Sequence, residues 1–536
     1  MNDSQLNSTA PDGAENVVPA QAPKMKAAKE HTAYSASLLL MFSSLLSGLL
    51  ALVRQKLVAK YFGASGATAA YVGAFELPDM IQYLLVGGVA SITLVTLLSR
   101  YHESGRDEEG DKALSVILNT IFVLIAVVLV FAWIFAPQYV AVKFPHFKKE
   151  EIDLCVHLTR ILMPGPLFFF AGGIFASRLL VRKIFLYQAL MPIVYSSGVV
   201  AGAIFLHGRI GIDSLAVGAI TGAFLGFLGI NYFGARKVGM RWYPLWDLKH
   251  PALREYLRLS LPVMLGASLP TADGWIRTYF ASSNVDSMAQ LSFARQLFTA
   301  PMSMLGAAAG AASLPFFASL WGQGKKKEFA GVVNRAVSRL MSVSILASGW
   351  MIALAVPLTD VTLRGGSFAV SDAVATANYL TLFSFALLCW TSQGIYARAF
   401  YGAGNTLTPM VSGTIVTLLA IPVYALLFHR MGMIGLVWAT DIGILAHAVS
   451  LAVLLHRSGM VSIGGLEWGE LGRALIASLL GAGAIAGLLR VLPVPHNHLG
   501  NLIHIAGASV LWIAVCLAVL LLMRSKLPKQ LFRLRG

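Results

Sequence analysis

Residues 113–136 read ALSVILNTIFVLIAVVLVFAWIFA, which is 24 residues without an acidic or basic side chain. A helix needs about 20 consecutive, mostly apolar residues to cross the hydrocarbon core of a bilayer. The segment is therefore predicted to be a membrane-spanning helix. Segments of the same kind recur along the chain, and their recurrence decides the fold class.

The composition fits a chain built from many such helices. Of the 536 residues, 57% are hydrophobic and 12% are charged, whereas a soluble domain carries about a quarter charged residues. Mean hydropathy is +0.71. These values exclude a soluble enzyme, a disordered chain and a disulfide scaffold, and they predict an all-α polytopic membrane protein. The predicted spans number 14 and lie near residues 35–57, 69–98, 113–136, 154–177, 184–206, 212–234, 257–280, 287–319, 336–357, 373–397, 406–428, 433–455, 472–492 and 499–523.

Connections between the predicted spans are short, so we expect no large extramembrane domain. The polar N-terminal segment has no short apolar region with a cleavage site, and we expect a disordered tail rather than a secretory signal. The predicted organisation is a disordered cytoplasmic tail at 1–33, an N-lobe of six spans at 34–235, a cytoplasmic linker at 236–256, a C-lobe of six spans at 257–457, two further spans at 458–524 and a basic cytoplasmic tail at 525–536.

The basic residues are distributed unevenly between the two sides of the predicted spans. Of the 41 lysines and arginines, 28 fall on the side that holds both termini and 8 on the opposite side. By the positive-inside rule, both termini are expected in the cytoplasm. The net charge of +16 therefore indicates loops that face anionic lipid, and it is not taken as a sign of nucleic-acid binding.

The chain contains an internal duplication. Tyr61–Phe62 recurs as Tyr279–Phe280 at an offset of 218, and GIFA at 173–176 recurs as GIYA at 394–397 at an offset of 221. Spans one to six are therefore expected to repeat as spans seven to twelve, in the same orientation. Two such lobes are related by an axis along the membrane normal, and cargo sites in such folds lie between the lobes near the midplane. This organisation is typical of a transporter.

Small residues and prolines predict where helices pack and bend. Gly218, Gly222 and Gly226 recur at four-residue spacing, which favours close helix packing. Pro262 and Pro270 lie inside the seventh span, where proline kinks a helix. We expect that helix to be the one that bends during transport.

Charged side chains inside spans are costly and predict a polar cavity. Two arginines on opposite lobes, Arg54 and Arg277, suit a phosphate-bearing cargo because a guanidinium binds phosphate through two hydrogen bonds and stays charged. Carboxylates in the same region are candidates for cavity contacts or for proton or sodium coupling. The candidate cargo-binding residues are Arg54, Arg277 and Arg295, and the candidate polar or coupling residues are Glu76, Asp79, Asp273 and Asp441.

Three simpler interpretations stay open. Asp273 and Arg277 are four residues apart and can neutralise each other on one helix face. Arg54 and Lys56 can extend to the membrane interface, and Glu76 and Asp79 can lie at an outer mouth. The sequence carries no metal-binding or nucleophile motif and no phosphate-binding loop, so we expect neither an enzyme nor a metal site. No cofactor is expected.

Four segments carry a family resemblance. LVRQKLVAKYFGA at 52–64, ATAAY at 67–71, AFELPD at 74–79 and RAFYGAGNTLTP at 398–409 resemble the MurJ/MviN family of the multidrug/oligosaccharidyl-lipid/polysaccharide exporter superfamily. The resemblance extends over the chain from about residue 35 and includes the fourteen spans. It implies a flippase of the bacterial inner membrane for lipid II, the undecaprenyl-pyrophosphate-linked peptidoglycan precursor. It also implies a cationic cavity and alternating access coupled to membrane potential, protons or sodium, together with contacts to the bilayer and to other cell-wall synthesis proteins.

The resemblance assigns Arg54 to the pyrophosphate, and this chain departs from the family elsewhere. A family arginine falls on Gly48, a usual acidic residue on Ala69, and a basic residue on Glu76. Arg277 and Arg295 are candidate substitutes for the missing arginines. These departures leave two alternatives: a flippase for another polyprenyl-linked saccharide, such as an O-antigen or exopolysaccharide unit, or a non-transporting cell-wall scaffold.

Overall fold

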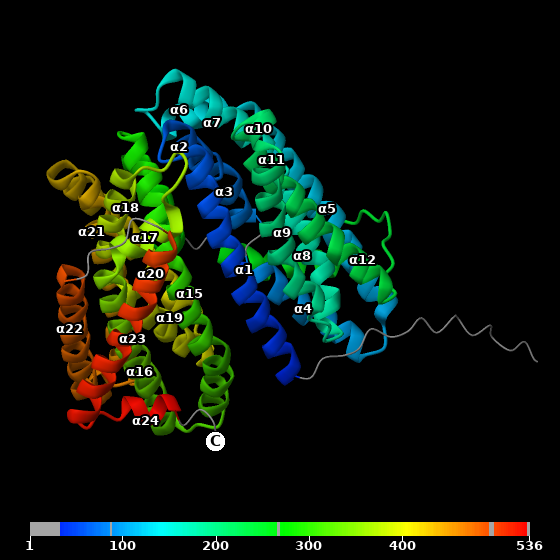
Figure 1. Ribbon diagram of the computed structural model, residues 1–536. Coiled ribbons are helices and arrows are strands. Elements are labelled where there is room, and N and C mark those ends of the chain that lie inside the picture. The colour runs from blue at the N-terminus through cyan, green and yellow to red at the C-terminus, as the bar shows by residue number, and fades with distance from the viewer. Residues whose placement is uncertain (1–32, 86–87, 265–268, 492–497, 533–536) are drawn as a thin grey trace, which may run out of the picture.

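A computed structural model describes residues 33–85, 88–264, 269–491 and 498–532. The predicted tail at 1–33 lies outside the described residues, except Ala33, where the first helix begins. Within the described part the chain is helical and has no strand beyond an isolated bridge between Gly365 and Phe368. Figure 1 shows two helical bundles that meet at one end, near α2 and α6, and diverge toward the end where α1 begins and α24 lies.

The helices follow one another with short connections. The N-terminal bundle contains α1 (Ala33–Phe62), α2 (Gly66–Ala74), α3 (Glu76–Leu85), α4 (Gly88–Glu103), α5 (Asp107–Ile134), α6 (Ala136–Lys143), α7 (Lys149–Leu162), α8 (Gly165–Val181), α9 (Leu186–Phe205), α10 (His207–Ile210), α11 (Asp213–Ala223), a π-helical turn η1 (Phe224–Gly229) and α12 (Ile230–Lys237). The rest of the chain contains α13 (Pro251–Met264), α14 (Leu269–Ala281), α15 (Val285–Gly322), α16 (Lys326–Ala353), α17 (Ala355–Leu363), α18 (Val370–Phe385), α19 (Leu387–Gly402), α20 (Leu407–Met431), α21 (Met433–Arg457), α22 (Trp468–Val491), α23 (His498–Leu522) and α24 (Leu527–Phe532).

The described helices confirm the membrane class but not the number of spans. Ten helices are long and apolar enough to cross a membrane, and the pair α18–α19, bent by 42°, raises the number to eleven. The other three predicted spans, 69–98, 257–280 and 287–319, correspond to α2–α4, α13–α14 and α15, which are not among those helices. The first two of these segments include residues outside the described part, 86–87 and 265–268, and all three carry charged side chains. Fourteen spans therefore stay a prediction.

The duplication is confirmed by the order of the helices and by their packing. α6 begins 219 residues before α17, α7 begins 221 residues before α18, and α9 begins 221 residues before α20. Equivalent helices also have equivalent neighbours, since α9 packs against α11 and α20 against α21, while α2 packs against α7 and α15 against α18. The two bundles thus share one order and one packing pattern of helices.

The segment between the two copies is attached to the N-terminal bundle. Asn119 of α5 donates from Nδ2 to the carbonyl oxygens of Tyr243 and Leu245, at 3.0 Å each. Leu253 and Tyr256 of α13 are buried in the same apolar core as α4, α5 and α8. The N-terminal bundle therefore includes α13, and the C-terminal bundle begins with α14.

The seventh predicted span contains two helices. α13 ends at Met264 and α14 begins at Leu269. Pro262 and Pro270, the predicted bending positions, belong to the last turn of α13 and the first turn of α14. The residues between these two helices, 265–268, lie outside the described part, and α13 and α14 belong to different bundles.

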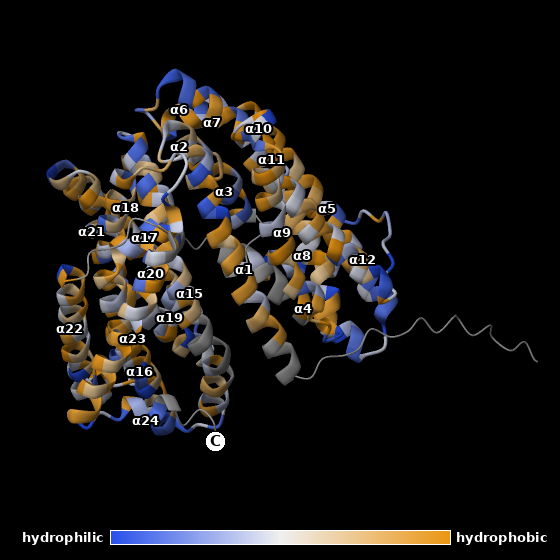
Figure 2. Ribbon diagram, in the orientation of Figure 1, coloured by the Kyte–Doolittle hydropathy of each residue, from blue (hydrophilic) through white to orange (hydrophobic). Residues whose placement is uncertain are grey.

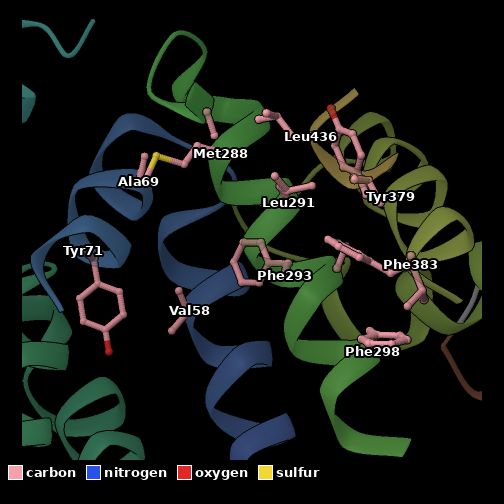
Figure 3. Packing of buried hydrophobic residues seen from close by; sticks show 14 of the residues in the cluster. Val58, Ala69, Tyr71, Met288, Leu291, Phe293, Phe298, Tyr379, Phe383 and Leu436 are labelled. Carbon is pink, nitrogen blue, oxygen red and sulfur yellow. The ribbon is translucent and has the colours of Figure 1, made fainter. Parts of the chain in front are cut away.

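The two bundles share an apolar core at one end only. Figure 3 shows Met288 and Phe293 of α15 facing the helices that carry Val58 and Ala69. At the opposite end the described buried residues form separate cores within each bundle. We call the shared end, near α2, α6 and the α17–α18 turn, the closed end, and the end where α1 begins the terminal end.

The last two long helices cover the outer side of the C-terminal bundle. Trp350 Nε1 of α16 donates to Ser509 Oγ of α23 at 2.9 Å, and Asn501 Nδ2 donates to Asp360 Oδ2 of α17 at 2.7 Å. Figure 2 shows hydrophobic colour along the outer helices, with hydrophilic colour at the two ends of the molecule and on α3 between the bundles. The apolar flanks suit a lipid environment, and the polar residues inside mark the region between the bundles.

Close helix packing at the predicted glycines leads to a stability prediction. A Cβ at Gly222 would lie 2.6 Å from the carbonyl oxygen of Tyr195, and one at Gly218 would lie 2.6 Å from that of Gly198. Gly222→Ala is expected to destabilise the protein by about 1–3 kcal/mol because backbone atoms cannot yield. Thermal unfolding of the purified protein measures this loss. Gly208→Ala is the control, since nothing lies within 4 Å of a Cβ there, and equal stability of both variants would contradict the packing.

Candidate functional site

The closed end is held by polar contacts between α1 and the α17–α18 turn. Lys56 Nζ donates to the carbonyl oxygens of Val361 and Arg364, at 3.1 and 2.8 Å. One turn further along α1, the Lys60 carbonyl accepts from the amide of Ser367 at 2.9 Å. Lys56 therefore joins the two bundles through hydrogen bonds to the α17–α18 turn.

Removal of the Lys56 ammonium should weaken the closed end. Hydrogen bonds to charged groups contribute about 1.5–3 kcal/mol each, and 1.4 kcal/mol is tenfold in an equilibrium. Lys56→Met is expected to raise the population opened at this end about tenfold. Spin labels on α1 and on the α17–α18 turn would report the distance distribution. Lys60→Met is the matched control because only its backbone bridges the bundles; identical distributions for the two variants would refute the role of Lys56.

Glu76 joins three helices at the closed end. Its carboxylate is 7% exposed. Oε2 lies 3.1 Å from Lys143 Nζ of α6, and Oε1 accepts from Thr278 Oγ1 of α14 at 2.7 Å. Lys143 also donates to the carbonyl oxygen of Trp275. Glu76 is therefore a buried link between the bundles at the closed end.

The buried acidic residue Asp273 is the centre of a network inside the C-terminal bundle. Asp273 is 1% exposed. Oδ2 pairs with Nη1 of Arg277, and Oδ1 accepts from Thr440 Oγ1 at 2.7 Å and from the Tyr424 hydroxyl. The predicted intrahelical pair of Asp273 and Arg277 is present. Tyr424 of α20 and Thr440 of α21 donate further hydrogen bonds to Asp273.

Arg295 of α15 completes this network through aromatic contacts. Its Nη2 lies 4.0 Å from Asp273 Oδ2. Its guanidinium lies 4.2 Å from the ring centroid of Trp390, 5.2 Å from that of Phe298 and 5.5 Å from that of Phe383. A desolvated cation over ring faces gains about 2 kcal/mol. The aromatic contacts therefore help to hold Arg295 inside the bundle.

Asp441 is the least satisfied acidic residue of the C-terminal bundle. It follows Thr440 on α21 and is 7% exposed. Neither of its buried carboxylate oxygens has a hydrogen-bond partner among the described residues. A buried, unpartnered carboxylate is costly unless it binds a proton or a cation. Among the same residues, no group of three or more His, Cys, Asp and Glu side chains could hold a metal ion.

Arg54 stands apart from the other candidate arginines. It is half-buried on α1 and, among the residues that the structure describes, has no hydrogen-bond or ion-pair partner. Tyr71 and Tyr195 lie within electrostatic range of its guanidinium. The structure brings Arg277 and Arg295 together at Asp273, and no described contact joins Arg54 to them.

Asp79 occupies a different place from its neighbour Glu76. It is exposed and lines a cavity of about 180 Å³ inside the N-terminal bundle. The predicted polar residues are therefore divided between three places: the closed end, the C-terminal network and this cavity.

Lys143 is the functional residue that the sequence did not predict. It follows the uncharged segment 113–136, where a lysine is ordinary for a loop that leaves the membrane. α6 folds back toward α14 and buries the Lys143 ammonium, of which 13% is exposed, against Glu76. The available signal was Glu76 itself, because a buried carboxylate requires a cationic or hydrogen-bonded partner.

Two duplicated bundles, closed against each other at one end and carrying charged networks between apolar helices, define a membrane transporter of the alternating-access class. Family comparison specifies the class. Residues 58–503 match the family described as "MurJ: Lipid II flippase MurJ", and the chain belongs to this family.

Individual relatives agree with this assignment. The "Lipid II flippase MurJ" of Burkholderia cenocepacia is 26% identical over 434 residues, covering 78% of this chain and 82% of the relative. The "Probable lipid II flippase MurJ" of Borreliella burgdorferi is 23% identical over 427 residues, covering 79% and 83%. The similarity thus extends over most of both chains.

Solved structures share the fold. A structure described as "Lipid II flippase MurJ, inward closed conformation" has a TM-score of 0.75 at 22% identity and covers 89% of this chain and 98% of its own. An inward-facing multidrug resistance MATE family transporter of the MOP superfamily has a TM-score of 0.63 at 14% identity and covers 84% and 99%. At these identities the likeness concerns the fold alone.

Proposed function

We propose that this protein is a flippase that moves lipid II, the lipid-linked peptidoglycan precursor, from the inner to the outer leaflet of the plasma membrane. One observation carries the proposal beyond family membership. Lys56, Lys143, Arg277 and Arg295 all bind protein partners, whereas Arg54 has none among the described residues. An uncommitted guanidinium is suited to a pyrophosphate, which it binds through two charge-assisted hydrogen bonds.

Transport would proceed by alternating access. With both termini in the cytoplasm, as the distribution of basic residues predicts, the terminal end faces inward and the closed end faces the periplasm. The headgroup would enter at the terminal end and meet Arg54. Rocking of the bundles would then break the closed-end contacts of Lys56 and Glu76 and open the opposite side, while the lipid tail stays in the bilayer.

The C-terminal network is the proposed coupling site. Asp273 and Asp441 are buried carboxylates on different helices of one bundle, and Asp441 lacks a hydrogen-bond partner among the described residues. Binding of a proton or a sodium ion there would change the balance of charge with Arg277 and Arg295. Such a change can drive the bundles from one arrangement to the other. No cofactor is required by this scheme.

A second candidate function has one observation in its favour. Glu76 binds Lys143 and Thr278 at a position where the family resemblance predicts a basic residue. The positive charge that the family resemblance predicts here is replaced by a buried Glu–Lys pair, which favours a flippase for another polyprenyl-linked saccharide. A non-transporting scaffold that contacts cell-wall synthesis proteins is the remaining alternative.

Complementation tests the proposed function in cells. The host's own lipid II flippase is depleted while this protein is expressed, and lipid II exposed on the outer face is measured. We expect exposure and growth to be restored. Good expression without restored exposure would reject lipid II as the cargo, and restored export of a different lipid-linked saccharide would identify the alternative.

A further inference from the structure

The cavity beside Asp79 lies wholly within the N-terminal bundle. Its walls come from α3, α8, α9, α11 and the π-helical turn η1. Its volume of about 180 Å³ exceeds that of an apolar protein cavity of about 150 Å³ that holds benzene. The cavity is therefore large enough for a small organic group.

Asp79 is the charged group on this cavity wall. The side chain is exposed, and among the described residues it has no hydrogen bond and no ion pair. The adjacent acidic residue Glu76, by contrast, is neutralised by Lys143. An acidic side chain that faces a cavity inside a membrane protein commonly marks a site for a substrate or an ion.

The opposite wall consists of aromatic rings in mutual contact. Phe169 and Phe227 lie 4.4 Å apart between centroids, and each lies 6.1 Å from Tyr195. All three rings are only half-buried. Phe227 belongs to η1, and π-helical turns are frequent at functional sites because they redirect side chains. Aromatic faces attract cations and are used to recognise organic ammonium groups.

We propose that this cavity binds an organic ammonium group, with Asp79 as its counterion and Phe169, Tyr195 and Phe227 as the enclosing rings. A bare metal ion is disfavoured because it prefers several oxygen ligands, whereas most of the side chains that line the cavity are aromatic or apolar. The group is an amine that belongs either to the headgroup of the cargo or to a free organic cation.

The position of the cavity favours an amine carried by the cargo, an inference that rests on the proposed function. Tyr195 lies within electrostatic range of both Arg54 and Asp79. A cargo that places its pyrophosphate at Arg54 would thus present nearby groups of its headgroup to Asp79. Arg54 would bind a negative group and Asp79 a positive group of the same molecule. The site would then select its cargo by both groups rather than by phosphate alone.

Binding of n-butylammonium chloride to the purified protein tests the cavity directly. Saturation-transfer NMR detects this weak ligand, and n-butanol serves as the neutral isostere. Asp79→Asn is expected to weaken n-butylammonium binding at least about tenfold, and Phe227→Leu is expected to weaken it without affecting the fold. Asp153→Asn is the matched control, because Asp153 is exposed on α7 of the same bundle. Unchanged binding in Asp79→Asn, equal binding of n-butanol, or no binding to the wild type would overturn the proposal.

Lipid II with a free amine, compared with lipid II whose amine is acetylated, identifies the source of the ammonium group. If the cargo supplies it, wild-type protein binds the free-amine form about tenfold more tightly, and Asp79→Asn does not discriminate. Equal binding of both forms, together with n-butylammonium binding, assigns the site to a free organic cation. Failure to bind either form of lipid II would contradict the proposed function. The n-butylammonium measurement would still show whether the cavity binds an ammonium group.

Discussion

Replacing Arg54 with alanine is expected to abolish transport of lipid II while leaving the protein folded. Arg54 has no partner among the described residues, so its removal leaves no protein group unpaired. The loss falls on the cargo, whose phosphate would forfeit hydrogen bonds to a charged donor that contribute about 1.5–3 kcal/mol. This corresponds to a decrease of about 10–150-fold in apparent affinity. Transport into the outer leaflet of proteoliposomes measures the effect.

Two variants make this expectation specific. Arg54→Lys retains the charge but loses the two-pronged geometry, so it should recover only part of the activity. Arg160→Ala removes another half-buried arginine, whose guanidinium lies 4.4 Å from the ring centroid of Trp133, and should transport normally. Full transport by Arg54→Ala would show that the pyrophosphate is bound elsewhere.

Replacing Asp273 with asparagine is expected to destabilise the C-terminal bundle strongly. The carboxylate pairs with Arg277 and lies 4.0 Å from Arg295, and its loss leaves two buried cations without an anion close by. Breaking a buried ion pair typically costs about 3–5 kcal/mol because a charge remains uncompensated. The thermal unfolding midpoint of the purified protein should fall, and any coupling that uses this carboxylate should be lost.

A double-mutant cycle separates the charge effect from loss of shape. Removing Arg277 in the same protein, as in Asp273→Asn with Arg277→Met, deletes one of the uncompensated cations and should restore part of the lost stability. Asp286→Asn, an exposed acidic residue at the start of α15, is the control and should change little. If Asp273→Asn and Asp286→Asn unfold at the same temperature, the network does not stabilise the fold.

The architecture could be predicted because long apolar segments have few alternatives. The uncharged segment 113–136 became α5, and the repeated motifs at 61–62 and 279–280 mark equivalent ends of α1 and α14. Hydropathy could not predict whether each of the more polar spans is a single helix. The seventh span divides into α13 and α14, and α13 packs with the N-terminal bundle, a choice made by tertiary contacts that periodicity does not record.

The candidate site was predictable in its residues but not in their grouping. Charges within spans are rare, so Asp273, Arg277 and Arg295 could be identified individually. Their meeting depends on the crossing of α14 and α15, and sequence spacing contains no information on that crossing. The expectation that Arg54 and Arg277 converge on one cargo group has no support in the described contacts, since Arg277 is already paired with Asp273. Lys143 was missed because only the folded position of α6 buries it.

Movement of lipid II by the purified protein is the most direct test of the account. The protein is reconstituted into liposomes that contain lipid II labelled on its headgroup, and a membrane-impermeant quencher reports the label that reaches the outer leaflet. We predict that wild-type protein equilibrates the label between leaflets, that Arg54→Ala does not, and that other polyprenyl-linked saccharides are moved poorly. A folded wild-type protein that leaves lipid II in place, or transport that is unaffected by Arg54→Ala, would contradict the account.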